Sequence, residues 1–534
     1  MNKQKIRKGT VKRLLDYIKR NYKKQFIAVF ICIIISSIAS VTSSLFLQTL
    51  IDNYITPLLE VPNPVFTGLL KMLGIMAIIY ALGIVTGYLY NRLMAVVAQG
   101  VLKDIRDEMF SKMEKLPIKY FDTHTHGEIM SHYTNDTDTL RQMISQGVPQ
   151  IISSSISIIA ILCGMIYLSP ILTIFVVAFT ISIIWITKKI ASKSSKYFVS
   201  QQESLGKVNG YIEEMLNGQK VIKVFTHEEK AKEEFDKLND KLNEDMYEAN
   251  KFLNIMMPVA NNLGNLQYVL IAILGTIFAL NGKLALSIGT IVSFLQLTKN
   301  FSQPINQVMN QMNSIIMALA GAGRIFEMMD EEPEVDKGYV TLVNVKKEKG
   351  ELIETQEKTG IWAWKHPHRD GRLEYIEVKG HIELKDVDFG YEDGKTVLHD
   401  ISIYAKPGQK IALVGATGAG KTTITNLINR FYDIEDGKIR YDGININKIK
   451  KEDLRKSLGM VLQDTNLFTG TIKENIRYGN EEATDEEVIK AAKLANAHSF
   501  IERLPNGYDT MLTRKWSKFI TRTKTIIVNC ESSN

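Results

Sequence analysis

The sequence has 534 residues, a formal net charge of +7, 45% hydrophobic and 23% charged residues, and a mean hydropathy of −0.04. These averages exclude a disordered chain and a collagen-like fibre, and only three cysteines (Cys32, Cys163, Cys530) exclude a disulfide scaffold or a cysteine-built zinc site. The averages conceal a difference between the two halves of the chain: the first half contains long uncharged runs, whereas the second half is charged throughout. This difference excludes a wholly soluble enzyme.

Three stretches of the first half, residues 25–51, 142–187 and 252–282, contain no Asp, Glu, Lys or Arg. A bilayer core takes about 20 apolar residues as helix, so these runs are long enough to cross it. Breaks at Ser169-Pro170 and Asn281-Gly282-Lys283 are typical of tight turns between two spans. We expect six spans, near residues 25–49, 72–91, 147–168, 171–187, 257–280 and 284–303.

The distribution of Lys and Arg predicts the orientation of these spans. The first 24 residues hold ten of them, and the stretches 92–146 and 188–251 hold many, whereas residues 51–64 hold none. Because cytoplasmic loops carry the excess positive charge, we expect the N-terminus in the cytoplasm, and six crossings return the C-terminus there. The expected domains are a cytoplasmic basic segment (1–24) and a membrane domain (25–325), whose spans continue as helices into the two long cytoplasmic loops.

A polar boundary segment follows at residues 326–378. It contains two tryptophans, Trp362 and Trp364, beside His366-Pro367-His368, a composition compatible with a metal or aromatic-cage site. His-Pro-His in a loop lacks the further ligands that zinc needs. The pattern therefore favours a folded insertion or linker anchored by its tryptophans.

The second half carries a nucleotide-binding pattern. Strand-like alternation at Ile382, Leu384, Val387 and Phe389 precedes a predicted apolar strand at residues 409–414, a loop matching G-x-x-x-x-G-K-[ST] in full, and a predicted helix at 423–431. Such a loop wraps phosphates with backbone N–H groups, its lysine reaches the β and γ oxygens, and its threonine suits Mg²⁺. The ATP-binding residues expected here are Gly415, Ala416, Thr417, Gly418, Ala419, Gly420, Lys421, Thr422 and Thr423.

With these features, the stretch from about residue 10 to Thr513 resembles the ATP-binding cassette (ABC) exporter subunits, which fuse a six-helix membrane domain to one nucleotide-binding domain. Tyr391 resembles the family's adenine-stacking ring, and Gln463 resembles the glutamine that reaches toward Mg²⁺ and the attacking water. Segments in both cytoplasmic loops resemble those that couple the two domains. The coupling residues carried over from that resemblance are Gly127, Glu128, Glu213, Glu214 and Gly218.

The resemblance implies a multidomain membrane protein, with an all-α six-helix exporter domain followed by an incomplete α/β P-loop domain at residues 379–513. It implies ATP and Mg²⁺ as cofactors, with Thr422 and Gln463 near the metal. Two subunits would close on ATP and move a small hydrophobic or amphipathic substrate out across a bacterial plasma membrane. The insertion resembles that of subunits in heterodimeric pairs, so a heterodimer is favoured over the alternative, a homodimer.

The family's L-S-G-G-Q signature, Walker B acidic residues and switch histidine are not found after Thr513. Read one base out of frame with permitted codons, residues 514–534 can encode L-S-Q-G-Q and its usual continuation, so we expect a frameshift there; a natural short tail is the alternative. We therefore expect exposed apolar edges, poor folding beyond about residue 378 and no ATP hydrolysis by this chain alone. The tail holds five basic residues against Glu531, so the net charge does not indicate nucleic-acid binding.

Three functions stay open at this point. The chain is an ATP-driven exporter subunit, a truncated nonfunctional product of such a gene, or a membrane-anchored regulator that binds nucleotide without turnover. A soluble P-loop kinase is excluded by the six expected spans.

Overall fold

The computed structural model describes residues 9–59, 62, 64–280, 286–368, 370–392, 394–461 and 467–512. The chain divides into two compact units. The first comprises the chain up to Glu114 together with His126–Glu331, and the second comprises Lys115–Thr125 together with the chain from Glu332 onward. Part of the basic segment (1–8), the turn at 281–283, Gln463 and the tail at 514–534 lie outside the described residues.

The described residues of the first unit form helices and their connections, as the fold prediction requires. The α-helices are α1 (Thr10–Asn21), α2 (Lys23–Leu50), α3 (Thr56–Leu59), α4 (Thr67–Met113), α6 (His126–Ser131), α7 (Thr137–Gln142), α8 (Val148–Leu168), α9 (Pro170–Asn217), α10 (Gln219–Phe225), α11 (Glu228–Leu280) and α12 (Ile288–Asp330). Short π-helical segments interrupt them at η1 (Ile51–Ile55), η2 (His132–Asp136) and η3 (Met143–Gly147).

The long helices extend well beyond the thickness of a membrane. Helices α4, α9 and α11 contain 47, 48 and 53 residues. At about 1.5 Å per residue they are roughly 70–80 Å long, more than twice the ~30 Å hydrocarbon core. The prediction that the spans continue as helices is confirmed. The turn predicted at Ser169-Pro170 is also confirmed, because Ser169 is extended and its side chain caps α9 by accepting from the Leu172 N–H.

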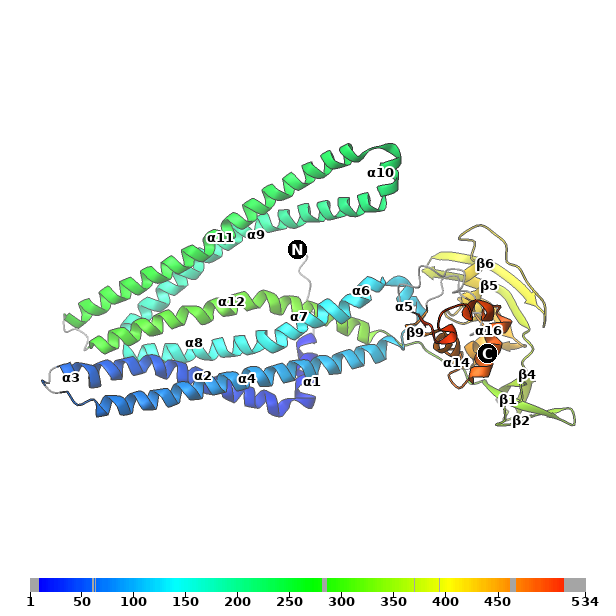
Figure 1. The fold of residues 1–534 in the computed structure, drawn as a ribbon, viewed down its shortest axis with the longest axis horizontal. Helices are drawn as coiled ribbons and strands as arrows, with labels where there is room; N and C mark the ends of the chain where they lie inside the picture. The colour runs from blue at the N-terminus through cyan, green and yellow to red at the C-terminus, as the bar shows by residue number, and fades with distance from the viewer. Residues whose placement is uncertain are drawn as a thin grey trace. The chain divides into compact units, whose positions relative to one another are not determined.

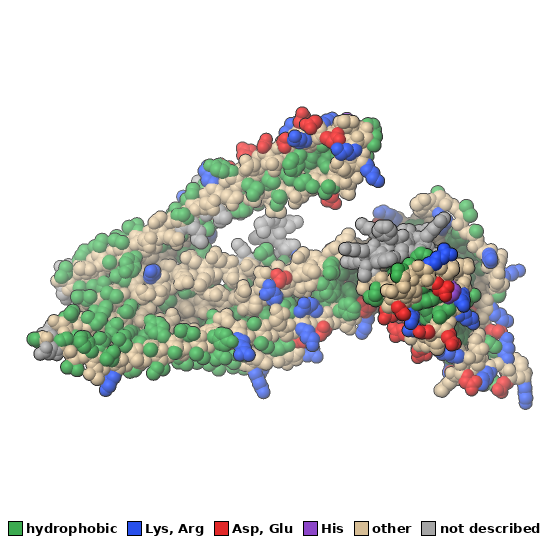
Figure 2. Space-filling view, viewed as in Figure 1, with side chains coloured by type: hydrophobic (Ala, Val, Ile, Leu, Met, Phe, Trp, Pro, Cys, Tyr) green, Lys and Arg blue, Asp and Glu red, His purple; other side chains and the backbone are tan. Residues whose placement is uncertain are grey.

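Five helical stretches of the described chain are long and apolar enough to cross a membrane. They are Lys23–Leu59, Thr67–Met113, His126–Leu168, Pro170–Asn217 and Glu228–Leu280. The sixth predicted span lies on α12, which is a continuous helix but is not among these five. Figure 2 shows hydrophobic side chains over much of the surface of the long helices, where residues such as Ile78 and Ile174 are each 71% exposed. Such an extended apolar surface fits contact with lipid.

The helices of the first unit pack in two groups joined by a common core. Helices α2 and α12 contact each other and both contact α4 and α8, whereas α9 pairs with α11 along its length and α10 joins their ends (Figure 1). The buried cluster that connects the groups takes one or more residues from each of five helices. Among its members are Val41, Met165, Val176, Ile271 and Phe294.

The second unit combines two antiparallel sheets with short helices. One sheet, in the order β2-β1-β3-β4, contains β1 (Thr341–Glu348), β2 (Glu351–Glu354), β3 (Trp362–Pro367) and β4 (Leu373–Glu377). The other, in the order β6-β5-β7-β8, contains β5 (Ile382–Glu392), β6 (Lys395–Ala405), β7 (Asp436–Tyr441) and β8 (Ile444–Asn445). The remaining elements are α5 (Ile118–Thr123), α13 (Lys421–Ile428), η4 (Ile446–Lys448), α14 (Lys451–Lys456), β9 (Gly470–Thr471), α15 (Ile472–Arg477), α16 (Asp485–Leu494), α17 (His498–Ile501), η5 (Gly507–Asp509) and β10 (Met511–Leu512).

The predicted insertion is a folded sheet whose tryptophan enters the core of the second unit. Trp364 is completely buried and packs edge-on against Tyr441 at 5.5 Å between ring centroids. Its indole N–H donates to Asp442 Oδ2 at 3.2 Å. The anchoring role expected of the tryptophans is therefore borne out for Trp364. The assignment of His366 to a loop is wrong, because β3 extends through Pro367.

The strand predicted from residue 382 onward is β5, but its alternation is interrupted. Leu384 and Val387 are both buried although they are three residues apart, because a register shift separates them in both strand pairings of β5. Asp386 takes a left-handed backbone there, with φ of 49°. A Cβ atom on the neighbouring Gly437 would lie 2.2 Å from the Asp386 carbonyl oxygen, so only glycine fits. This bulge places Leu384 and Val387 on the same face of the sheet, toward the core.

The strand predicted at residues 409–414 is not formed. None of the strands in the described residues pairs with this segment, and Val414 is 93% exposed. Parallel strands depend on neighbours and on cover from both faces. The preceding strand β6 belongs to the antiparallel sheet β6-β5-β7-β8, and this sheet provides no parallel neighbour for residues 409–414 among the described residues. The expected exposure of apolar edges is seen here.

An ion-pair cluster fastens the segment after α12 to the second unit. The Glu334 carboxylate accepts from Arg455 Nη1 and Nη2 at 2.9 and 2.5 Å and from Lys451 Nζ at 3.2 Å. Burial favours its neutral form, but the two cations hold the pKa of Glu334 below its usual value of 4.5. Because the pKa of Glu334 is lower in the folded than in the unfolded chain, its carboxylate stabilises the unit at pH values above the unfolded-state pKa. This stability is lost as the pH falls through the folded-state pKa.

We expect Glu334→Gln to cost about 1–2 kcal/mol at pH 7 and to flatten the loss of stability below about pH 4.5. Thermal unfolding of the second unit, followed by protease sensitivity between pH 3 and 7, measures both effects. Glu332→Gln changes an exposed neighbour and serves as the matched control. Equal pH profiles for wild type and Glu334→Gln would show that the cluster does not stabilise the unit.

Candidate functional site

The P-loop lies exposed at the start of α13. Residues 411–419 are exposed, and the last glycine, Gly420, is buried and caps the helix with φ of 82°. A Cβ atom on Gly420 would lie 2.4 Å from Leu398 Cδ2, and Gly418 also has a positive φ of 87°. Both positions therefore require glycine. The loop brings residues 415–420 to the N-terminal end of α13, where backbone N–H groups and the helix dipole favour an anion.

Lys421 is folded back over this loop. Its Nζ donates to the carbonyl oxygens of Gly415 and Ala416 at 2.9 and 2.7 Å. Thr422, the next residue, is exposed in the first turn of α13. An ammonium group, a helix N-terminus and an exposed hydroxyl form the donor set that fits a nucleotide phosphate, with the hydroxyl suited to Mg²⁺.

Tyr391 is held against the same helix. Its hydroxyl donates to Thr423 Oγ1 at 3.1 Å, two residues after Lys421. Its ring meets the rings of Phe389 and Tyr432 edge-on, at 5.0 Å between centroids in each case. The structure thus brings Tyr391 to the start of α13, beside the predicted site residues Lys421 and Thr423. Tyr391 and Thr423 are 32 positions apart, and this spacing alone does not predict their contact.

Gln463, which was expected near Mg²⁺, lies outside the described residues. The predicted coupling residues fall in the first unit: Gly127 and Glu128 in α6, Glu213 and Glu214 near the end of α9, and Gly218 between α9 and α10. Gly218 continues the helical bonding by donating its N–H to the Glu214 carbonyl at 2.8 Å. The structure therefore places these five residues in helices of the first unit or at the junction between two of them.

The sequence reasoning missed Tyr432. Its hydroxyl donates to Asp122 of α5, a helix that belongs to the second unit. Burial and the Asp122 carboxylate raise the pKa of Tyr432, so the phenol keeps its proton and remains the donor. Since the Tyr432 ring also contacts Tyr391, one continuous set of contacts joins Asp122 of α5 to Thr423 in α13.

Comparison with known proteins extends this picture to the whole chain. The family model described as the ABC transporter transmembrane region matches residues 26–305, and the one described as ABC transporter matches residues 398–516. The chain is 38% identical over 515 residues to an uncharacterized ABC transporter ATP-binding protein, YfiC, of Bacillus subtilis, covering 96% of this chain and 79% of that protein.

Two further relatives carry names that state a cargo. A fatty acid ABC transporter ATP-binding/permease protein of Mycobacterium tuberculosis is 32% identical over 468 residues, which cover 86% of this chain and 69% of that protein. A probable multidrug resistance ABC transporter ATP-binding/permease protein, YheH, of Bacillus subtilis is 28% identical over 460 residues, which cover 85% of this chain and 63% of that protein.

Proposed function

Because the chain belongs to the ABC transporter family and fuses an exporter-type membrane region to an ATP-binding domain, we propose that it is one subunit of an ATP-driven exporter. The P-loop with Lys421 and Thr422 at the start of α13 is the observation that carries the proposal. The cargo proposed is a small hydrophobic or amphipathic molecule. The wide apolar helix surface and the names of the fatty acid and multidrug relatives support that substrate class.

Each of the nucleotide-binding residues is proposed to contact a different part of MgATP. Lys421 exchanges its two loop carbonyls for phosphate oxygens, and the N-terminal end of α13 stabilises their negative charge. The Thr422 hydroxyl would hold Mg²⁺, and Gln463 is proposed on the same side by resemblance. When bound, Mg²⁺ neutralises charge on the phosphates. Tyr391 offers an aromatic ring for the adenine, fixed in position by Thr423.

A second half-transporter completes the proposed assembly. In the part of the chain that the structure describes, nothing buries a residue of α10, and its Val221, Val224 and Phe225 are 60%, 77% and 66% exposed. An apolar patch at the end of two long paired helices suits a protein partner. The proposed coupling residues Glu213, Glu214 and Gly218 lie directly before this helix. The proposed pair is a heterodimer in a bacterial plasma membrane, with the N-terminus and the ATP-binding domain in the cytoplasm.

The contact between Tyr432 and Asp122 is proposed to carry nucleotide state to the first cytoplasmic loop. Tyr432→Phe keeps the ring that packs on Tyr391 and removes the hydroxyl that holds Asp122. We expect ATP affinity to change less than about threefold, while the ATP-dependent change in tryptic cleavage at the exposed Lys119 is lost. Tyr404→Phe, at an exposed tyrosine of β6, is the control. Unaltered ATP-dependent cleavage in Tyr432→Phe contradicts this role.

Uptake of a fluorescent amphipathic dye into inside-out vesicles tests the proposed function. The chain is expressed with its partner subunit, and uptake with and without MgATP is compared for wild type and Lys421→Ala. The exporter proposal predicts ATP-dependent uptake that Lys421→Ala abolishes. ATP binding without uptake would favour the regulator, and neither binding nor uptake would favour the nonfunctional product.

A further inference from the structure

Two histidines and a glutamate meet on one face of the β3–β4 hairpin. His366 lies in β3, His368 follows two residues later, and Glu374 of β4 is the register partner of His366. Residues two apart on a strand point to the same face, and directly paired residues across an antiparallel ladder have Cβ atoms about 4.5–5.5 Å apart. The hairpin therefore brings together three side chains that the sequence alone leaves eight residues apart.

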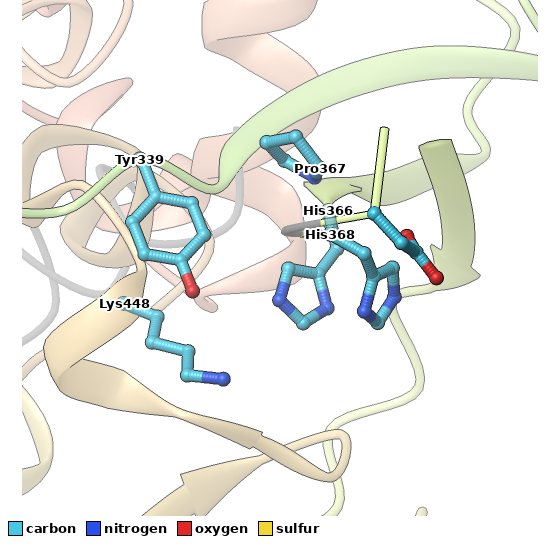
Figure 3. A pocket seen from close by; sticks show the side chains of 6 residues that line it. Tyr339, His366, Pro367, His368 and Lys448 are labelled. Atoms are coloured by element: carbon cyan, nitrogen blue, oxygen red, sulfur yellow. The ribbon is translucent and has the colours of Figure 1, made fainter. Parts of the chain in front are cut away.

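The three side chains converge closely. One ligand atom from each of them lies within 4.8 Å of those of the other two. The imidazole rings of His366 and His368 are 4.3 Å apart between centroids, and His368 Nε2 lies 2.7 Å from Glu374 Oε2. Figure 3 shows the two rings side by side at a cavity of about 400 Å³, which Tyr339 and Lys448 also line. His366 is buried, whereas His368 and Glu374 reach solvent, so an ion can enter from outside.

Ordinary ion pairing accounts for only part of this arrangement. A contact between His368 and Glu374 explains those two residues, but it gives no reason for a second, buried imidazole that lies beside the first at an interplanar angle of 40°. A neutral imidazole is the form that binds a metal. Lys448 also lines the cavity, and its positive charge opposes a cation there.

We propose that His366, His368 and Glu374 form a binding site for a divalent transition metal ion of the Zn²⁺, Cu²⁺ and Ni²⁺ class. Two imidazoles and one carboxylate are a ligand set that such ions prefer, with water completing the coordination. Three protein ligands leave an open position, unlike the closed four-ligand sites of zinc fingers. This inference is independent of the proposed transport function.

The position of the site gives the ion a structural effect. The face that carries His366 and His368 also carries Trp364, which enters the core of the second unit. Across the cavity, Tyr339 donates its N–H to the Lys448 carbonyl at 2.8 Å, and Val340 forms a parallel bridge with Ile449. An ion that fixes the hairpin therefore also fixes the insertion on the ATP-binding unit. At a free concentration 100 times its Kd, it would raise the folded-to-unfolded ratio of that unit about 100-fold.

The test uses the full-length chain, purified without a histidine tag and stripped of metal. We expect one equivalent of Zn²⁺ by equilibrium dialysis and a Cu²⁺ EPR spectrum with two nitrogen ligands. His368→Ala and Glu374→Gln, both at solvent-accessible positions, should each weaken Zn²⁺ binding at least about tenfold. Lys448→Met should strengthen binding by removing an opposing charge.

His399→Ala is the matched control, because His399 is an exposed histidine of β6 outside the cluster. Binding that survives His368→Ala and Glu374→Gln unchanged, or an EPR spectrum without nitrogen ligands, would overturn the site. Circular dichroism of each variant verifies the fold, and His366→Ala is avoided as a primary test because that residue is buried.

Discussion

Replacing Lys421 by alanine is expected to weaken ATP binding about 10- to 150-fold. The Nζ of Lys421 sits over the loop carbonyls of Gly415 and Ala416, in position to meet phosphate oxygens. A hydrogen bond to a charged group contributes about 1.5–3 kcal/mol, which corresponds to this range of affinity. Equilibrium titration of the purified chain with a fluorescent ATP analogue in Mg²⁺ measures the effect.

Lys395→Ala provides the control for the loss of one positive charge. Lys395 is exposed on β6 and pairs with Glu392, so its removal should change the affinity less than about twofold. If both variants bind ATP as well as wild type, the loop at 415–422 is not the nucleotide site. A loss of affinity in both variants would indicate general electrostatic attraction instead of a specific phosphate contact.

The second large effect is expected from Trp364→Ala, which should destabilise the second unit by about 3–5 kcal/mol. The indole is completely buried among residues of β5, β7 and α14, and its N–H has a partner in Asp442. Truncation removes this packing and leaves a cavity beneath the insertion. Since each 1.4 kcal/mol is tenfold, protease cleavage of the second unit through its opened form should rise by roughly a hundredfold or more.

Trp185→Ala is the comparison for Trp364→Ala. Trp185 is 63% exposed and belongs to the first unit, so its loss should leave cleavage of the second unit unchanged. If Trp364→Ala leaves that cleavage within about twofold of wild type, the insertion is an appendage that does not support the ATP-binding unit.

The parts of the fold that the sequence predicted best are those set by local composition. An uncharged run of about 20 residues has few alternatives to a membrane helix, and five such runs coincide with helices of the required character. The P-loop pattern was equally informative, because Gly418 and Gly420 take backbone angles that favour glycine and Gly420 also lies too close to Leu398 for a side chain.

The parts that it could not predict depend on contacts between distant residues. The sheet β1–β4 lies in a polar segment whose anchoring is carried mainly by Trp364, so its periodicity is weak. The bulge at Asp386 depends on Gly437, 51 residues away. The contact of Asp122 with Tyr432 joins positions 310 apart. Segment 409–414 shows the opposite failure, since its apolar composition predicts a strand that needs neighbours to form.

The same reason applies to the candidate sites. Local pattern identified the phosphate-binding loop, but Tyr391 came from resemblance and Tyr432 from the structure alone. The sequence disfavoured a metal site at His366 and His368 because His-Pro-His was assigned to a loop and showed no further ligands nearby. Strand register, which depends on the turn between β3 and β4, is what supplies Glu374 as the third ligand.

Photolabelling with an azido-ATP tests the central claim, that this chain holds ATP between the P-loop and Tyr391, most directly. The chain is labelled in membranes with Mg²⁺, digested, and the labelled peptide is identified by mass spectrometry. The account predicts a label on the peptide that contains Tyr391, competed by unlabelled ATP and absent in Lys421→Ala. A label that persists in Lys421→Ala, or that lies on a peptide remote from Tyr391 and residues 415–423, would contradict it.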